Sequence, residues 1–364
     1  MMREVFSGDT VSQQVRLSWS KEVIDTASLP DGVREFEHRG KYYYLNVQNN
    51  PLPDEQKLQE WKKEWDRFFG SPADSYVYEK KRTLVKKFSA CGLTGEFYHI
   101  SNGPGGRYEP AALLLPEKGE APYPVVIMPF YYPANVVGFD PLTGIVSDES
   151  GRKPGSWSRG AVLARAGFAV LTCTSYYRTY INNDMPEDFT RWQYAAETLL
   201  KENPEWSGTG KLVYDNQLLV DFAVEDPRLD SERIGVMGHS LGGKIAFYMN
   251  YFEPRIKAVV ASDFGMGWHQ TNWSDLWYWG DKVKAMEEKN MEHSQLLALS
   301  KHPLLVIAGH YDNEGTKAFF ERAKALGNGC ELLLDNHADG HWIPSESFDG
   351  AIKFLRKHLN IKDI

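Results

Sequence analysis

Cysteine is scarce in this sequence. Its three cysteines, Cys91, Cys173 and Cys330, lie far apart and form no Cys-x-x-Cys pair. A disulfide framework needs an even set of cysteines and a structural zinc site needs paired ligands, so neither is expected. The sparse cysteine content instead favours a reducing compartment.

Long apolar runs are also missing. The first residues, MMREVFSGDTVSQQV, contain no apolar stretch of the roughly 7 to 15 residues that form the core of a secretory signal. No run elsewhere approaches the ~20 apolar residues that a membrane-spanning helix needs. We therefore expect a soluble, cytoplasmic protein that has no membrane partner.

Positive charge is in deficit, because 41 Lys and Arg residues stand against 49 Asp and Glu residues, a net charge of -8. A negatively charged chain repels the phosphates of nucleic acids and of anionic membranes. We therefore do not expect a nucleic-acid partner. The remaining composition, 42% hydrophobic and 25% charged, is that of a globular protein with a sizeable core.

The length of 364 residues predicts one large domain with an extension in front of it. Residues 1–85 are polar and rich in Lys, Glu and aromatic residues. Within them, the segment 53–70 carries an apolar stripe at helical spacing, formed by Leu58, Trp61, Trp65 and Phe68. We therefore expect an N-terminal, partly helical extension over 1–85 and a main domain over 86–364.

From about residue 94 the pattern changes to that of an α/β domain. Two strand-like runs flank the turn-rich segment 102–106, which predicts an antiparallel entry to a sheet. Short apolar strands then alternate with helical stretches, at 125–129, 168–175, 233–238, 256–262, 303–309 and 330–335. This alternation predicts a mostly parallel sheet covered by helices on both faces. Three long insertions are expected to build a site, at 135–158, 176–190 and 264–300.

The strongest motif is Gly238-His239-Ser240-Leu241-Gly242, which follows a predicted strand and precedes a predicted helix. A serine between glycines in this setting occupies a strained turn that exposes its hydroxyl, while the small residues allow close packing. The first N–H groups of a helix have no partner within it, so the Leu241 N–H can donate to an oxyanion. The motif therefore predicts that Ser240 is a nucleophile.

A phosphate-binding loop is a competing interpretation of the same residues. Gly238 to Lys244 has the spacing G-x-x-x-x-G-K, but the next residue is Ile245. A nucleotide site of this kind needs Ser or Thr there, because its hydroxyl binds magnesium. A nucleotide site is therefore poorly supported.

With this motif the chain resembles the α/β-hydrolase superfamily over about residues 94–364, because nucleophile, acid and histidine arrive in the order Ser, Asp, His. The segment GHSLGGK, the long insertions and the N-terminal helical extension resemble most closely the carboxylesterase and acetyl-xylan-esterase-like branch near the dienelactone hydrolases. The resemblance implies that residues 86–364 are an α/β-hydrolase catalytic domain with lid insertions.

The resemblance also implies a histidine in the loop before the last helix. His341, which follows Gly340, matches this loop, and His337 is an alternative in the same loop. The two histidines are four residues apart, but Asp339 and Gly340 argue against a helix and no HExxH motif is present. We therefore expect no metal and no cofactor.

For the acid, the resemblance favours Asp312, which follows the predicted strand 303–309 at the sheet edge where open α/β sheets place their sites. Asp263, after the preceding strand, and Glu314 are alternatives. The second oxyanion donor is expected just past the strand 125–129. Pro129 has no N–H, so Phe130, Tyr131 or Tyr132 would supply it, and Tyr131 is preferred. The family's usual His-Gly is absent there, which would allow a tyrosine hydroxyl to line the pocket.

Two further residues are candidates for binding substrate. Trp268 begins a cluster of tryptophans in the insertion after Asp263, and tryptophan faces stack on sugar rings or apolar groups. Lys244 resembles the lysine of the glucuronoyl-esterase motif, in which Leu241 here replaces an arginine. Both favour a small-molecule or carbohydrate ester as the substrate.

The sequence thus predicts a serine esterase in which Ser240 attacks, His341 transfers the proton and Asp312 orients His341. Three alternatives keep the same fold: a serine peptidase or amidase, a glucuronoyl-esterase-like enzyme, and a non-catalytic binding protein. The sequence leaves a homo-oligomer open.

Overall fold

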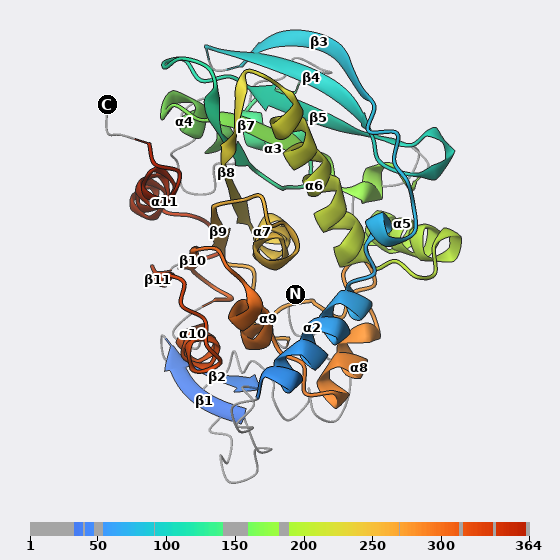
Figure 1. The fold of residues 1–364 in the computed structure, drawn as a ribbon, viewed down its shortest axis with the longest axis vertical. Helices are drawn as coiled ribbons and strands as arrows, with labels where there is room; N and C mark the ends of the chain where they lie inside the picture. The colour runs from blue at the N-terminus through green and yellow to red at the C-terminus, as the bar shows by residue number, and fades with distance from the viewer. Residues whose placement is uncertain are drawn as a thin grey trace.

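The structure is a computed structural model and describes residues 33–38, 41–46, 54–90, 92–140, 159–181, 189–268, 270–312, 316–337 and 340–361. Near its start, β1 (Val33–His38) and β2 (Lys41–Asn46) form a two-stranded antiparallel hairpin. Figure 1 shows this hairpin in blue, beside the main body of the molecule.

In the described chain, nine strands form the main sheet in the order β11-β10-β9-β8-β6-β7-β5-β4-β3. Their bounds are β3 (Arg82–Ala90), β4 (Leu93–Ser101), β5 (Tyr108–Leu114), β6 (Tyr123–Ile127), β7 (Ala169–Cys173), β8 (Leu229–His239), β9 (Ala258–Ser262), β10 (Leu304–Ala308) and β11 (Leu332–Asn336). Strands β6 to β11 pair in parallel, whereas β3, β4 and β5 form an antiparallel edge that joins β7. The predicted parallel sheet with an antiparallel entry is confirmed.

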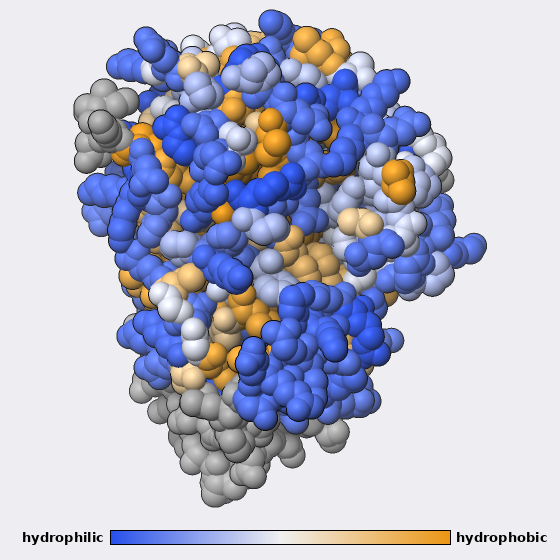
Figure 2. All heavy atoms as spheres, viewed as in Figure 1, coloured by the Kyte–Doolittle hydropathy of each residue, from blue (hydrophilic) through white to orange (hydrophobic). Residues whose placement is uncertain are grey.

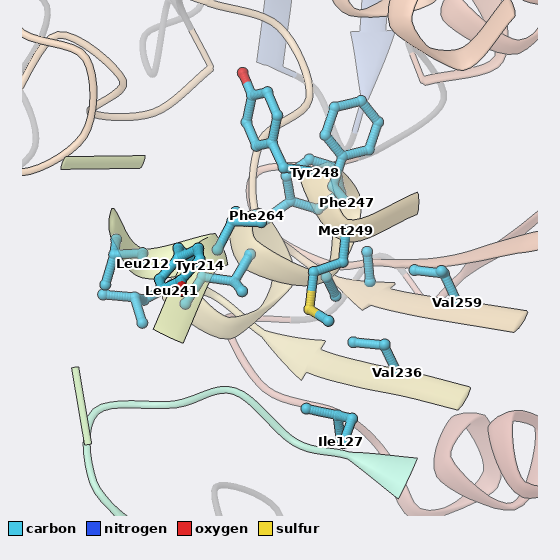
Figure 3. Packing of buried hydrophobic residues seen from close by; sticks show 14 of the residues in the cluster. Ile127, Leu212, Tyr214, Val236, Leu241, Phe247, Tyr248, Met249, Val259 and Phe264 are labelled. Atoms are coloured by element: carbon cyan, nitrogen blue, oxygen red, sulfur yellow. The ribbon is translucent and has the colours of Figure 1, made fainter. Parts of the chain in front are cut away.

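Helices cover both faces of this sheet. Successive residues of a strand point to opposite faces, so neighbouring residues enter different cores. Val236 and Val259 belong to a core shared with α6 (Gly208–Glu225), α7 (Leu241–Phe252) and α10 (Thr316–Ala325). Met237 and Val260 belong to a second core shared with α4 (Arg159–Arg165) and α11 (Ser345–His358). In Figure 1, α7 and α11 lie on opposite sides of the sheet, and Figure 3 shows α7 packed over β6, β8 and β9. The α/β-hydrolase fold is confirmed.

The remaining helices lie in the segments between the strands or at the start of the chain. They are α2 (Glu55–Phe69), α3 (Pro133–Val137), α5 (Phe189–Glu202), α8 (Lys282–Glu288) and α9 (His293–Leu299), with short 3-10 turns at Pro72–Asp74, Pro104–Gly106 and Tyr176–Arg178. The insertion predicted at 264–300 therefore folds into α8, α9 and the turns before them. Of the other two insertions, residues 141–158 and 182–188 lie outside the described residues.

The helix predicted near residues 53–70 forms as α2. Asp54 caps its start by accepting from the Lys57 N–H at 2.8 Å, and Gly70 ends it with a left-handed φ of 58°. Its apolar stripe is buried, and Trp65 and Phe68 belong to the same core as α6 and α7. Figure 2 shows hydrophilic side chains over its outer face. The helix α2 thus shares a core with the main domain. The domain boundary at residue 85 stays a prediction.

Candidate active site

Ser240 joins β8 to α7 in a strained turn. Its φ of 55° and ψ of -117° lie where residues with a side chain are rarely found. The flanking glycines are required by close contacts: a Cβ on Gly238 would lie 2.0 Å from the Gly242 carbonyl oxygen, and a Cβ on Gly242 would lie 2.0 Å from that of Pro129. The Ser240 N–H donates to the Ser262 carbonyl at 2.8 Å, which ties the turn to β9. The spacing of the glycines thus has a steric cause.

A continuous chain of hydrogen bonds begins at the Ser240 hydroxyl. Its Oγ lies 2.9 Å from Nε2 of His341, and Nδ1 of His341 lies 2.7 Å from Oδ2 of Asp263. His341 lies in the loop between β11 and α11, and Asp263 directly follows β9. A hydroxyl, an imidazole and a carboxylate in this order can move the serine proton to the histidine. The structure therefore brings together Ser240 and His341, as predicted, with a different acid.

Asp263 is held in place from both sides. Oδ1 accepts backbone N–H groups from Gly309 at 3.1 Å, Tyr311 at 2.7 Å and Asp312 at 2.9 Å, which leaves Oδ2 for His341. Burial acts to raise the pKa of Asp263, but hydrogen bonding and charge from His341 outweigh it and hold this pKa below its ordinary value. Asp263 is therefore a buried carboxylate that stays ionised beside the imidazole.

Asp312 does not contact His341, and the prediction that it orients the histidine is corrected. Its carboxylate accepts the N–H groups of Phe264 at 2.8 Å, Gly265 at 3.0 Å and Met266 at 2.8 Å. Strand order explains the correction: β9 is the direct neighbour of β8, so the residue after β9 reaches the histidine beside Ser240, and the residue after β10 lies one strand further away. Burial, with the charge of Asp263, raises the pKa of Asp312 to about 7. Glu314, the other alternative, lies outside the described residues.

His337, the alternative base, occupies a different position. Its ring lies against Gly309, where an added Cβ would come within 3.0 Å of the imidazole. The backbone N–H of His337 donates to the Ala308 carbonyl at 3.2 Å. The histidine that is hydrogen-bonded to the Ser240 hydroxyl is His341. Another histidine, His239, packs beside His341 with its pKa lowered by burial to about 3, so it stays neutral.

The two predicted oxyanion donors come from different segments, the start of α7 and the loop after β6. Leu241 is the first residue of α7, so its N–H belongs to the first turn, where no carbonyl of the same helix can accept it. Tyr131 lies on the loop after β6, near enough to Ser240 to interact with it electrostatically. Burial raises the pKa of the Tyr131 phenol to about 12, although the interaction with Ser240 lowers it.

Lys244 is enclosed rather than open to a substrate. Its Nζ donates to Oδ1 of Asn272 at 2.8 Å and lies 4.3 Å from the centre of the Trp273 ring and 3.9 Å from that of Tyr278. Burial lowers the pKa of Lys244 well below its ordinary value. The side chain thus joins the first turn of α7 to the insertion after β9, and the geometry does not support substrate binding by Lys244.

Trp268 is also a core residue. Its indole N–H donates to the Met291 carbonyl at 2.9 Å, and its ring packs 4.1 Å from the His293 ring and stacks 6.1 Å from that of Trp65. Only 6% of its surface is exposed. The structure therefore places Trp268 between the insertion and α2, and Trp268 does not line the cavity that Tyr131 borders.

That cavity, with a volume of about 410 Å³, is bordered by Tyr131 and lies among aromatic and basic side chains of the insertion at 176–190 and of α5. The other residues that line it are Tyr132, Tyr177, Arg178, Phe189, Arg191 and Trp192. Trp277 packs behind this wall, since its ring stacks on Phe189 and meets Trp192 edge to face. The sequence predicted the insertion at 176–190 but did not identify these residues as the lining of a pocket. Their aromatic side chains, close together in the sequence, were the signal that could have identified them.

Within the described ranges, no three His, Cys, Asp or Glu side chains gather in a way that could hold a metal ion. The same part of the chain has no helix that is both long and apolar enough to cross a bilayer.

Several solved structures have a similar fold and low sequence identity to this chain. A glucuronoyl esterase from Solibacter usitatus is 16% identical with a TM-score of 0.60, over 86% of this chain and 95% of that one. A promiscuous esterase from the marine bacterial metagenome is 14% identical with a TM-score of 0.61, over 94% and 100%. A glucuronoyl esterase from Teredinibacter turnerae is 18% identical with a TM-score of 0.57, over 82% and 85%. These similarities support the fold.

The sequence itself matches a family. No curated protein is similar enough to report. The sequence profile of the dienelactone hydrolase family, however, matches residues 145–334, a span that covers more than half of the chain and includes the serine turn, Asp263 and Asp312. This chain therefore belongs to the dienelactone hydrolase family.

Proposed function

We propose that this protein is a serine hydrolase that cleaves carboxylic esters, with Ser240 as nucleophile, His341 as general base and then general acid, and Asp263 as the residue that orients His341. The observation that carries the proposal is the hydrogen-bonded chain from Ser240 through His341 to Asp263 on a strained strand-to-helix turn. Membership of the dienelactone hydrolase family supports the same class of reaction.

The geometry gives each residue a step in the reaction. Asp263 accepts from Nδ1–H of His341, so Nε2 is free to accept the Ser240 proton as Oγ bonds to the ester carbonyl carbon. The protonated His341 then donates to the leaving alcohol, and an acyl-serine remains. Water attacks this acyl group, with His341 again taking the proton, and Ser240 is regenerated. No cofactor takes part in these steps.

The developing oxyanion needs donors that are already in place. The Leu241 N–H and a donor from Tyr131 are the candidates, because Leu241 begins α7 and Tyr131 lies on the loop after β6, which packs against the serine turn at Gly242. Removal of one such donor costs about 10²–10³ in kcat in a well-studied serine protease.

For the substrate, we favour an ester that carries a ring, such as an acylated carbohydrate. Rings stack on aromatic side chains, and the cavity beside Tyr131 is lined by Tyr132, Tyr177, Phe189 and Trp192. Glucuronoyl esterases among the structures of similar fold agree with this substrate class. The cytoplasmic location and a homo-oligomer stay predictions from the sequence.

The test is covalent labelling with a fluorophosphonate, followed by intact-protein mass. We expect one adduct on the wild type, none on Ser240→Ala, and an unchanged adduct on Ser89→Ala, which alters an exposed serine of β3. Hydrolysis of p-nitrophenyl esters of graded acyl length and of acetylated xylan would then define the substrate. An unlabelled wild type with no turnover of any ester would refute the proposal and favour a binding protein.

A further inference from the structure

The backbone at Asp263 has a conformation that is costly for a residue with a side chain. Its φ is 41°, in the left-handed region that favours glycine. Such a conformation persists only where the surrounding structure holds it. The three residues that follow, Phe264, Gly265 and Met266, all donate their N–H groups to the Asp312 carboxylate. The loop after β9 therefore carries the restraints that keep Asp263 in place.

His293, the first residue of α9, holds the end of this loop. Its Nδ1 is hydrogen-bonded to the Met266 carbonyl, and its Nε2 lies 2.7 Å from the Tyr248 hydroxyl. A carbonyl oxygen only accepts, so Nδ1 carries the proton. Burial lowers the pKa of His293 to about 3, so the imidazole is neutral and Nε2 is an acceptor for the Tyr248 hydroxyl. The Tyr248 oxygen accepts in turn from the Trp279 indole N–H at 3.1 Å.

These hydrogen bonds continue from His293 to the histidine beside Ser240. The Met266 N–H donates to Oδ1 of Asp312 at 2.8 Å, and the Asp312 N–H donates to Oδ1 of Asp263 at 2.9 Å. Oδ2 of Asp263 then lies 2.7 Å from Nδ1 of His341. His293 is 1% exposed, and both carboxylates are fully buried. Because water does not reach these groups, no water molecule can replace a lost donor at little cost.

Aromatic rings from three elements fix the His293 ring. Trp65 of α2 stacks on it at 5.8 Å, Trp268 of the insertion packs at 4.1 Å, and Phe247 of α7 meets it edge to face at 5.0 Å. Figure 3 shows Phe247 and Tyr248 on the side of α7 that faces away from the strands. In a close-packed core the imidazole cannot turn without displacing these rings. Helix α2, near the start of the chain, therefore supports the same ring that holds the loop after β9.

Resting on the proposed serine hydrolase activity, we propose that His293 is a positioning residue, which holds the loop after β9 through the Met266 carbonyl so that Asp263 stays aligned with His341. It acts through Asp263 and not on the substrate. Loss of its N–H would leave the buried carbonyl without this donor and would let the strained backbone at Asp263 relax. The carboxylate would then move away from Nδ1 of His341.

The test compares His293→Leu with His293→Asn. The two new side chains have nearly the same size, but only the NH₂ of Asn can donate from about the position of Nδ1. For p-nitrophenyl acetate, kcat of His293→Leu should fall by about 10- to 100-fold while KM stays nearly constant, as for a small misplacement of a catalytic group. His293→Asn should keep most of the wild-type kcat.

Leu297→Ala is the matched control for lost stability. Leu297 is a fully buried side chain of the same helix, so its truncation should lower the unfolding midpoint as well. At a temperature where all variants are folded, Leu297→Ala should keep wild-type kcat. The downfield proton NMR signal of the hydrogen bond between His341 and Asp263 should shift or disappear in His293→Leu and stay unchanged in Leu297→Ala.

Three outcomes would overturn the proposal: wild-type kcat in His293→Leu, equal losses of kcat in His293→Leu and Leu297→Ala, or no recovery of kcat in His293→Asn. If His293→Leu does not fold, Tyr248→Phe takes its place, because Nε2 then loses its donor and the tautomer is no longer fixed. Its kcat should fall at constant KM, and an unchanged kcat would also refute the role. If wild type neither reacts with fluorophosphonate nor hydrolyses esters, the parent activity fails; if wild type is active and His293→Leu is equally active, only this inference fails.

Discussion

Asp263 and Asp312 each accept backbone N–H groups from the loop that carries the other. Asp263 binds the N–H groups of Gly309, Tyr311 and Asp312, and Asp312 binds those of Phe264, Gly265 and Met266. The two carboxylates thus hold the loops after β9 and β10 together. Only Asp263 has an oxygen left over for His341. Asp263 therefore orients His341, whereas Asp312 holds the loop that carries Asp263. Substitution of each aspartate can test this difference in role.

Asp263→Asn should remove activity and keep the fold. The amide oxygen can still accept the three backbone N–H groups, but its NH₂ would face Nδ1 of His341 and force Nε2 to carry a proton toward Ser240. We expect kcat to fall by about 10⁴, as when the wrong tautomer is imposed in a Ser-His-Asp triad. Steady-state kinetics and thermal unfolding measure the two properties.

Asp312→Asn is the matched comparison and should behave in the opposite way. One of its three backbone donors would face an NH₂ group, which costs about 1–3 kcal/mol of folding free energy. We expect a lower unfolding midpoint and a much smaller loss of kcat than in Asp263→Asn. If Asp312→Asn proved as inactive as Ser240→Ala while fully folded, the assignment of Asp263 as the orienting acid would be wrong.

Gly242→Ala should disrupt the site sterically. The new Cβ would meet the Pro129 carbonyl oxygen at 2.0 Å and push the loop of Tyr131 away from Ser240. We expect a loss of about 1–3 kcal/mol in stability together with slower fluorophosphonate labelling. Gly350→Ala is the control, since its Cβ has open space in α11, and it should stabilise the protein by about 0.5–1 kcal/mol. Equal stability of the two variants in urea would contradict this steric account.

Phe189→Ala should change selectivity for the size of the substrate. Phe189 is 65% exposed at the cavity, where its ring stacks on Trp277 at 5.7 Å. We expect kcat/KM to fall by about 10- to 200-fold for long or ring-bearing acyl groups, the effect of about 1–3 kcal/mol of apolar contact, and to stay unchanged for acetate. Val77→Ala, at an exposed site that does not line this cavity, is the control. A uniform loss over the whole acyl series would argue against an acyl-binding role.

Lys244→Met should leave KM close to that of the wild type. The ammonium group is enclosed by Asn272, Trp273 and Tyr278, so it is in no position to meet a substrate, and Met has a similar length. We expect changes of less than about threefold in kcat/KM for carbohydrate esters. A large rise in KM for these esters alone would restore Lys244 as a substrate ligand.

His293→Gln should reduce the sensitivity of the fold to acid. His293 is buried against the Met266 carbonyl and the Tyr248 hydroxyl, and burial lowers its pKa from 6.5 to about 3. Between these values the unfolded chain binds a proton that the native imidazole does not, so this contribution to stability is present above pH 6.5 and is lost as the pH falls toward 3. Urea midpoints should therefore decline less in the variant than in the wild type from pH 7 to about pH 4. Parallel declines would show that His293 does not remain neutral in the native state.

Much of the fold and of the serine turn follows from local sequence. Strand, Gly-x-Ser-x-Gly and helix are continuous in the chain, and the close contacts of Gly238 and Gly242 involve the turn itself and the loop beside it. The antiparallel entry and the parallel strands could likewise be predicted, because apolar runs of strand length alternate with helical stretches. Ser240 and the Leu241 N–H could be named because both depend on a few consecutive residues.

The acid, the cavity and the partners of Lys244 could only be decided by the tertiary structure. Asp263 and Asp312 each follow an apolar strand and carry the same local signal, but strand order places the loop after β9 next to β8. Lys244 lies one turn from Ser240 in the sequence, and only the packing of the insertion after β9 encloses its ammonium group. Local sequence determines which groups a turn or helix presents. Which of them meet across the sheet depends on long-range pairing, because contacts between distant strands leave no trace in either segment alone.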